Sequence, residues 1–228
     1  MNTCTIDFYL LALWWSSLQS KLIISYLEKN SHQNILKIIS EINENNWNRA
    51  KTIWIFDVCK RISDMSQICC FGSEYEFFTQ HIVFMQRFNR TEICENCGHN
   101  STNPREQNYL YFDQQFGKIV INILKATACI QCNNEMRIDF QFVQDFPCWL
   151  ILEIGYQVKL TVNELPKLLN LKNKNYKLLC ATYNSGGLHF LGTFLVNGEF
   201  YLVDDRNPRV CNKVTPKKQI TTCFYYME

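Results

Sequence analysis

Apolar residues fall three and four positions apart through the first part of the chain. Between Ile6 and Glu44 this spacing, which is typical of helices that bury one face, involves Leu10, Leu11, Trp14, Leu18, Leu22, Tyr26, Ile35, Leu36, Ile38, Ile39 and Ile42. Asn45 and Asn46 are expected to end the second helix, and Trp47 to Asp64 continues a helical mixture of aromatic, apolar and basic residues. The pattern predicts that an α-helical lobe comes first.

Beyond Gly72 the apolar residues tend to alternate with polar ones, as they do in strands. The strand-like segments are 119–124, 137–142, 149–154, 176–183 and a closing segment at 222–226. Asn163 to Pro166 predicts a turn, and we expect Lys172 to Lys174 to be a short basic linker. Helices followed by strands predict an α+β protein.

The strongest local signal is a hairpin around Asn197-Gly198, which separates two strand-like runs. His189 stands at the start of the first run, and the second run, Phe200 to Val203, leads directly into Asp204 and Asp205. We therefore expect the hairpin to bring His189 back beside Asp204. A histidine oriented by a carboxylate is the general base of nucleophilic catalysis.

Cys4 is the candidate nucleophile, because it directly precedes the first predicted helix. A thiol at a helix N-terminus lies at the positive end of the helix dipole, which lowers its pKa and favours the thiolate. The alternative interpretation is that Cys4 is a buried structural thiol and His189 a hydrogen-bonded core histidine.

Composition restricts the compartment and the partners. The chain has 228 residues, 47% of them hydrophobic, and a net charge of +2 without long charged runs, so we expect no nucleic-acid or membrane partner. The apolar run Phe8 to Trp15 is too short to span a bilayer. Twelve cysteines, four of them in two Cys-x-x-Cys pairs, favour a reducing compartment, cytoplasmic or nuclear, and metal binding over a disulfide scaffold.

The two Cys-x-x-Cys pairs have the form of zinc knuckles. Cys94 and Cys97 are followed by Gly98, and Cys129 and Cys132 by Asn133; both following residues tolerate the tight backbone that a knuckle needs. Strand-like sequence lies between the pairs, so we expect both to converge on one tetrahedral zinc. Four protein ligands leave no open position, which predicts a structural ion.

These features occur in an order that resembles the ubiquitin-specific protease family of papain-like cysteine isopeptidases. The resemblance covers nearly the whole chain and rests on Asn2-Thr3-Cys4, the two knuckles, Phe146 to Ile154, Tyr183 to Phe190, Phe200 to Asp205 and Cys223 to Tyr226.

The resemblance implies one catalytic domain over 1–228, with a helical thumb at 1–75, zinc-bearing fingers at 90–145 and an antiparallel-sheet palm at 146–228. It implies a thiol deubiquitinase that hydrolyses isopeptide bonds at the C-terminal glycine of ubiquitin. The implied residues are the triad Cys4, His189 and Asp204, the secondary acidic residue Asp205, and a substrate-tail channel at Gly186, Gly187, Leu188 and Phe190. No cofactor other than structural zinc is implied.

The sequence also departs from the family pattern. Asp7 stands where most members have Asn, and the diverged SUMO isopeptidase branch resembles this chain in having Asp there. Leu188 and Phe190 stand where the main family favours Gly and Tyr. The family's oxyanion-stabilising Asn would fall upstream of Met1, which leaves backbone N–H groups at Thr3 and Cys4 or an upstream residue as donors. The alternatives are therefore an isopeptidase for SUMO or another ubiquitin-like modifier, and an inactive ubiquitin-binding module.

Overall fold

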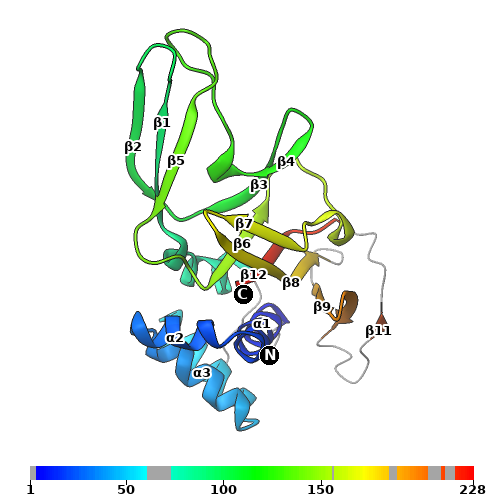
Figure 1. Cartoon of the computed structure of the whole chain (residues 1–228). Coiled ribbons are helices and arrows are strands. Elements are labelled where there is room, and N and C mark those ends of the chain that lie inside the picture. Colours follow the sequence, from blue (N-terminus) through cyan, green and yellow to red (C-terminus); the bar gives the residue numbers. More distant parts are fainter. Residues whose placement is uncertain (1–3, 61–72, 156, 185–188, 205–211, 214–218) are drawn as a thin grey trace.

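The computed structural model describes residues 4–60, 73–155, 157–184, 189–204, 212–213 and 219–228, without the side chains of 4–5, 102–106 and 184 (Figure 1). Helices come first, as the sequence predicts: α1 (Cys4–Gln19), α2 (Lys21–Lys29), α3 (Gln33–Asn43), α4 (Trp47–Ile53), a π-helical turn (Trp54–Val58) and α5 (Glu74–Phe77). Single 3-10 turns occupy Thr79–His81, Val83–Gln86, Asn122–Leu124 and Val162–Glu164. Within these described ranges, no helix combines the length and the apolar character needed to cross a membrane.

Most strands form one large sheet in the order β11-β10-β9-β8-β12-β6-β3-β4, with β7 also paired to β8. Their bounds are β3 (Leu110–Gln115), β4 (Lys118–Ile121), β6 (Trp149–Ile154), β7 (Leu168–Leu171), β8 (Lys174–Asn184), β9 (Phe190–Val196), β10 (Glu199–Val203), β11 (Asn212–Lys213) and β12 (Thr222–Met227). The pairing of β3 with β6 is parallel, whereas the other pairings are antiparallel.

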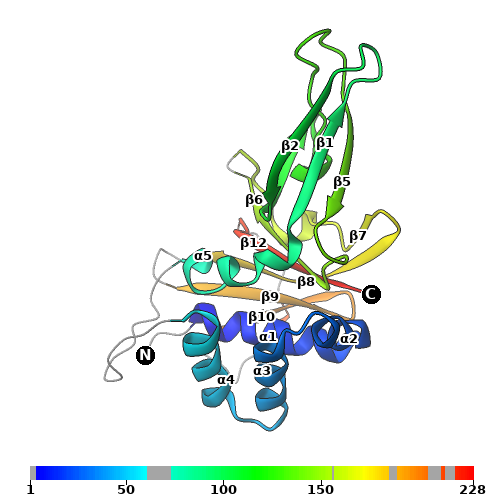
Figure 2. The same ribbon diagram turned by 90° about the vertical axis from the view of Figure 1, so that its left-hand side faces the viewer.

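A separate three-stranded sheet has the order β2-β1-β5, with β1 (Phe88–Ile93), β2 (Asn100–Gln107) and β5 (Arg137–Phe142). Figure 2 shows it projecting from the side of the large sheet that is opposite to α1–α4. The segment 90–145 thus divides between two sheets, because β3 and β4 belong to the large one.

The centre of the large sheet is buried on both faces, so its central strands contribute to two cores. In β6, Trp149 and Ile151 pack toward the helices, whereas Leu150 and Leu152 pack into the core on the other face. Trp149 Nε1 also donates to Ser16 Oγ of α1 at 2.9 Å. This double burial explains why β6 has a continuous apolar sequence rather than an alternating one.

Two local predictions are wrong. The strand predicted over 119–124 ends at Ile121, because the Asn122 side chain bonds Tyr111 N at 3.1 Å and Tyr109 O at 3.2 Å and so substitutes for strand pairing. The predicted linker at Lys172 to Lys174 is instead the tight turn between β7 and β8. Lys172 (φ 46°) and Asn173 (φ 68°) both have left-handed backbones, as a two-residue hairpin turn requires.

Candidate functional site

The predicted hairpin is present and brings His189 to Asp204. Asn197 (φ 50°) and Gly198 (φ 83°) form the turn between β9 and β10, whose register pairs Val203 with Gly192. His189 immediately precedes β9 and Asp204 immediately follows β10, so both lie at the open end of the hairpin. His189 Nε2 lies 2.7 Å from Asp204 Oδ1, with the imidazole buried and the carboxylate half-buried. Such a contact fixes the ring's orientation and tautomer.

The charge of Asp204 acts on a tyrosine of the neighbouring strand β8. Tyr183 lies near the end of β8 and is paired with Leu191 of β9. Burial raises the pKa of Tyr183 above its usual value, and the negative charge of Asp204 raises it further. The Asp204 carboxylate is thus close enough to the sheet interior to influence a buried hydroxyl.

The first helix packs on the strand that follows His189. Phe8 of α1 fills the space above Gly192, where an added Cβ would lie 1.6 Å from the Phe8 ring. The same ring lies 5.0 Å from the ring of Phe194, two residues further along β9. Glycine at position 192 therefore allows α1 to approach the backbone of β9 closely.

Contacts further along both elements show their relative direction. An apolar groove of about 350 Å³ lies between α1, from Leu11 onward, and the strands β9 and β10. Its lining is Leu11, Trp14, Trp15, Phe194, Val196, Tyr201 and Val203. Since later residues of α1 face later residues of β9, the helix and the strand run in the same direction. The start of α1 at Cys4 therefore lies at the end of β9 where His189 stands. The Cys4 side chain lies outside the described part of the chain.

A buried carboxyl group joins α1 to the sheet. Glu74 accepts hydrogen bonds from Tyr9 of α1 at 2.8 Å, from Thr221 at 2.8 Å and from Thr222 at 3.3 Å. Thr182 of β8 completes this group through a hydroxyl contact of 3.0 Å to Thr221. Burial raises the pKa of Glu74 above its ordinary value, although the hydrogen bonds act in the opposite direction. We call these five residues the Glu74 cluster. Sequence reasoning missed it, because an isolated Glu after a serine is an ordinary helix start.

Asp7, which suggested the SUMO branch, has a partner within the helical lobe. Its carboxylate lies 2.6 Å from Lys51 Nζ of α4, and both side chains are largely buried. This ion pair between two helices gives Asp7 a structural role that does not involve a modifier.

The two knuckles have the same backbone geometry. In the first, Gly98 N donates to Cys94 O and Cys94 N donates to His99 O; in the second, Asn133 N donates to Cys129 O and Cys129 N donates to Asn134 O. Gly98 (φ 73°) and Asn133 (φ 58°) take the left-handed backbone that the sequence predicted for them. The knuckles lie at one end of the small sheet, since Ile93 at the end of β1 pairs with Arg137 at the start of β5.

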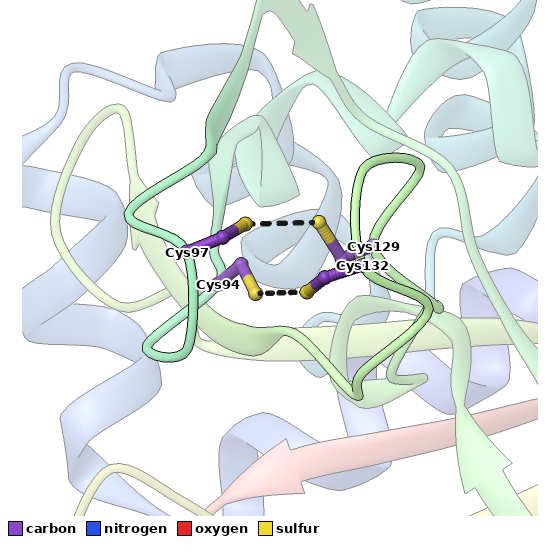
Figure 3. A group of neighbouring side chains, drawn as sticks. All are labelled: Cys94, Cys97, Cys129 and Cys132. Atoms are coloured by element: carbon purple, nitrogen blue, oxygen red, sulfur yellow. Dashed lines mark hydrogen bonds between the residues drawn. The ribbon is translucent and has the colours of Figure 1, made fainter.

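This arrangement brings the four thiols together (Figure 3). Cys94 Sγ lies 3.4 Å from Cys132 Sγ, Cys97 Sγ lies 3.6 Å from Cys129 Sγ, and all four sulfurs lie within 4.8 Å of one another. Sulfurs about 2.3 Å from a tetrahedral zinc are roughly 3.8 Å apart. The spacing is far too long for disulfide bonds, which measure about 2.05 Å. The cluster is compatible with a structural zinc site.

The thiols of the cluster also affect each other's ionisation. The backbone N–H of Asn134 and then the Cys94 thiol lower the pKa of Cys132 to about 6. The pKa of Cys97 rises to about 12: the His99 N–H lowers it, but burial and the three neighbouring thiols outweigh that effect. Four thiolates this close repel one another, and a divalent cation would offset the repulsion.

The other predicted residues are placed as follows. Phe190, predicted to line the substrate-tail channel, begins β9 and is half-buried. Gly186, Gly187, Leu188 and Asp205 lie outside the described residues.

No protein-family model and no curated protein matches the chain. Among solved structures it is similar to a chain of the yeast SAGA deubiquitinase module (DUBm), at 14% identity over 81% of this chain and 50% of that one, with a TM-score of 0.37. It is also similar to the papain-like protease of MERS coronavirus, at 12% identity over 84% of this chain and 55% of that one, with a TM-score of 0.46. The chain thus spans about half the length of these solved structures.

Proposed function

We propose that the chain is a cysteine isopeptidase that cleaves ubiquitin from its conjugates with Cys4, His189 and Asp204. The observation that carries the proposal is the His189–Asp204 contact of 2.7 Å at the end of the hairpin where α1 begins with Cys4. A thiol, an imidazole and a carboxylate are the components of a cysteine-type triad.

Each group has one task in this reaction. Because Nε2 of His189 contacts Asp204, the proton of the Cys4 thiol passes to Nδ1. The thiolate attacks the carbonyl carbon of the C-terminal glycine of ubiquitin, and the lysine amine leaves with the proton held by His189. Water, deprotonated by His189, then hydrolyses the thioester and restores the thiol. The first N–H groups of α1 lack helical partners and would stabilise the anionic intermediate.

In this proposal zinc has a structural task only. Cys94, Cys97, Cys129 and Cys132 would hold it and so tie the end of β1 to the start of β5. Residues 1–228 act as one catalytic domain within the cell. The helical lobe corresponds to the thumb, the zinc-bearing small sheet to the fingers, and the large sheet to the palm.

Ubiquitin and SUMO probes with a C-terminal electrophile test the proposal. We expect the ubiquitin probe to label the protein at Cys4 and the Cys4→Ser variant to lose labelling. Cys59→Ser, which removes a half-buried thiol outside the triad, should label normally. Labelling by the SUMO probe alone would replace ubiquitin by SUMO as the modifier.

A fluorogenic ubiquitin substrate separates an enzyme from an inactive module. His189→Ala should lower turnover by about 10²–10⁴-fold, which is the usual contribution of a positioned general base. Ubiquitin binding without turnover, unaffected by Cys4→Ser, would instead identify an inactive ubiquitin-binding module.

A further inference from the structure

Glu74 is a buried carboxyl group that the proposed triad does not use. It begins the short helix α5 and is about nine-tenths buried. Burial of a carboxyl group is unfavourable unless hydrogen bonds compensate for lost water. The compensation here comes from hydroxyl groups on two other elements, α1 and the segment leading into β12.

The Glu74 cluster connects the two elements that bear on the candidate active site. On one side, Tyr9 lies on the second turn of α1, and its ring is stacked on Phe78 at 4.0 Å. On the other side, Thr221 contacts Thr182 of β8, and Thr182 pairs with Gly192 on the neighbouring strand β9. Gly192 is the residue against which Phe8 packs, three positions after His189. The cluster is therefore close to the candidate triad on two sides: Tyr9 lies about one helical turn after Cys4, and Thr182 lies on the strand next to β9, which follows His189.

We propose that Glu74 is a positioning residue: it holds the first half of α1, and with it Cys4, at a fixed distance from β9, the strand that directly follows His189. This inference rests on the proposed function for its catalytic consequence, but the positioning itself does not require the protein to be an enzyme.

Directionality distinguishes this role from simple packing. The packing of Phe8 on Gly192 sets how closely α1 approaches β9, but apolar burial is non-directional and imposes no angle at a particular atom. Hydrogen bonds restrict both distance and angle, and the carboxylate accepts from α1 with one oxygen and from the β12 side with the other. Glu74 thus adds a restraint on distance and angle at Tyr9 to the apolar packing that holds α1 close to β9.

Three variants and one control separate the possibilities. Glu74→Leu fills the space but leaves the hydroxyls of Tyr9, Thr221 and Thr222 without their acceptor. Glu74→Gln keeps an acceptor for Tyr9, and Tyr9→Phe removes only the hydrogen bond on the helix side. Leu171→Ala, in the core on the other face of the sheet, serves as a destabilised control.

Amide hydrogen exchange along α1 gives the first readout. Glu74→Leu should speed exchange of residues 8–12 relative to residues 15–19 by about tenfold, the effect of leaving a buried hydroxyl unpartnered. Tyr9→Phe should have a smaller effect in the same residues, and Glu74→Gln should resemble the wild type. Leu171→Ala should not change the ratio. An unchanged ratio in both Glu74→Leu and Tyr9→Phe would overturn the inference.

Steady-state kinetics with the fluorogenic ubiquitin substrate give the second readout. Glu74→Leu should lower kcat by up to about 100-fold at nearly constant KM, as expected for a displaced nucleophile, and Glu74→Gln should restore it. If the wild type shows no turnover while Glu74→Leu still loosens residues 8–12, the proposed function fails and the positioning role stands. If the wild type is active and Glu74→Leu changes neither readout, the positioning role fails and the function stands.

Discussion

Gly192→Ala tests the contact that sets α1 against β9. The new Cβ would lie 1.6, 2.2 and 2.4 Å from three atoms of the Phe8 ring. Carbon atoms in contact are about 3.5–4.0 Å apart, so the ring would have to move by about 2 Å. It cannot swing aside freely, because it is 93% buried and lies 5.6 Å from the Tyr9 ring and 5.0 Å from the Phe194 ring. We expect the start of α1 to shift instead.

Two opposing effects determine whether Gly192→Ala raises or lowers the free energy of unfolding. Alanine in a strand is favoured over glycine by about 0.5–1 kcal/mol when space is available. Overpacking a filled core costs about 1–3 kcal/mol. We therefore expect Gly192→Ala to lower the free energy of unfolding by about 1–3 kcal/mol and to lower turnover as well.

Urea denaturation of five variants, three single and two double, measures this coupling. Phe8→Leu shortens the ring that meets the added methyl group, so Gly192→Ala should cost less in the Phe8→Leu background, with a coupling of about 0.5–3 kcal/mol. Gly198→Ala is the matched control: it is disfavoured by its φ of 83° but has open space around it, so Phe8→Leu should not change its cost. A Gly192→Ala protein more stable than the wild type would refute the packing argument.

Three further predictions concern other parts of the chain. Chelation of zinc should lower the melting temperature and should expose β1, β2 and β5 to hydrogen exchange before α1 or β9; an unchanged melt would contradict a structural zinc. Burial raises the pKa of Glu74, so its carboxyl group keeps its proton up to a higher pH in the folded chain than in the unfolded chain. The resulting stability is present below the unfolded-state pKa and is lost as pH rises through the folded-state pKa, so Glu74→Gln should flatten this decline in a denaturation series against pH. Phe116→Asn should raise the free energy of unfolding by about 1 kcal/mol in urea denaturation, because exposed Phe116 has a left-handed backbone (φ 49°) that asparagine tolerates better; a decrease would show that the ring has a structural contact.

Local sequence signals predicted local structure well. Asn197-Gly198 set the turn that places His189 beside Asp204, and the residues after each Cys-x-x-Cys pair have the expected left-handed backbone. In each case a few neighbouring residues determine the geometry. The helical lobe was predicted for the same reason, because periodicity is a local property.

Arrangements that depend on distant contacts could not be predicted in this way. No local pattern indicates that β3 and β4 join the large sheet while β1, β2 and β5 form another. The Glu74 cluster combines residues from four separate regions of the sequence, and each of them is unremarkable alone. The position of α1 along β9 depends on Phe8 and Gly192, which are 184 residues apart in sequence (192 − 8).

The location of β12 has a consequence for how the chain acquires its structure during synthesis. Among the strands that the structure describes, β12 lies between β8 and β6 and pairs with both, so it joins the two halves of the large sheet. Until residues 222–227 have been synthesised, the edges of β8 and β6 lack the strand that covers them in the folded chain. Closure of the sheet must follow translation of this segment, and until then the open edges are sites where nascent chains could aggregate or recruit a chaperone.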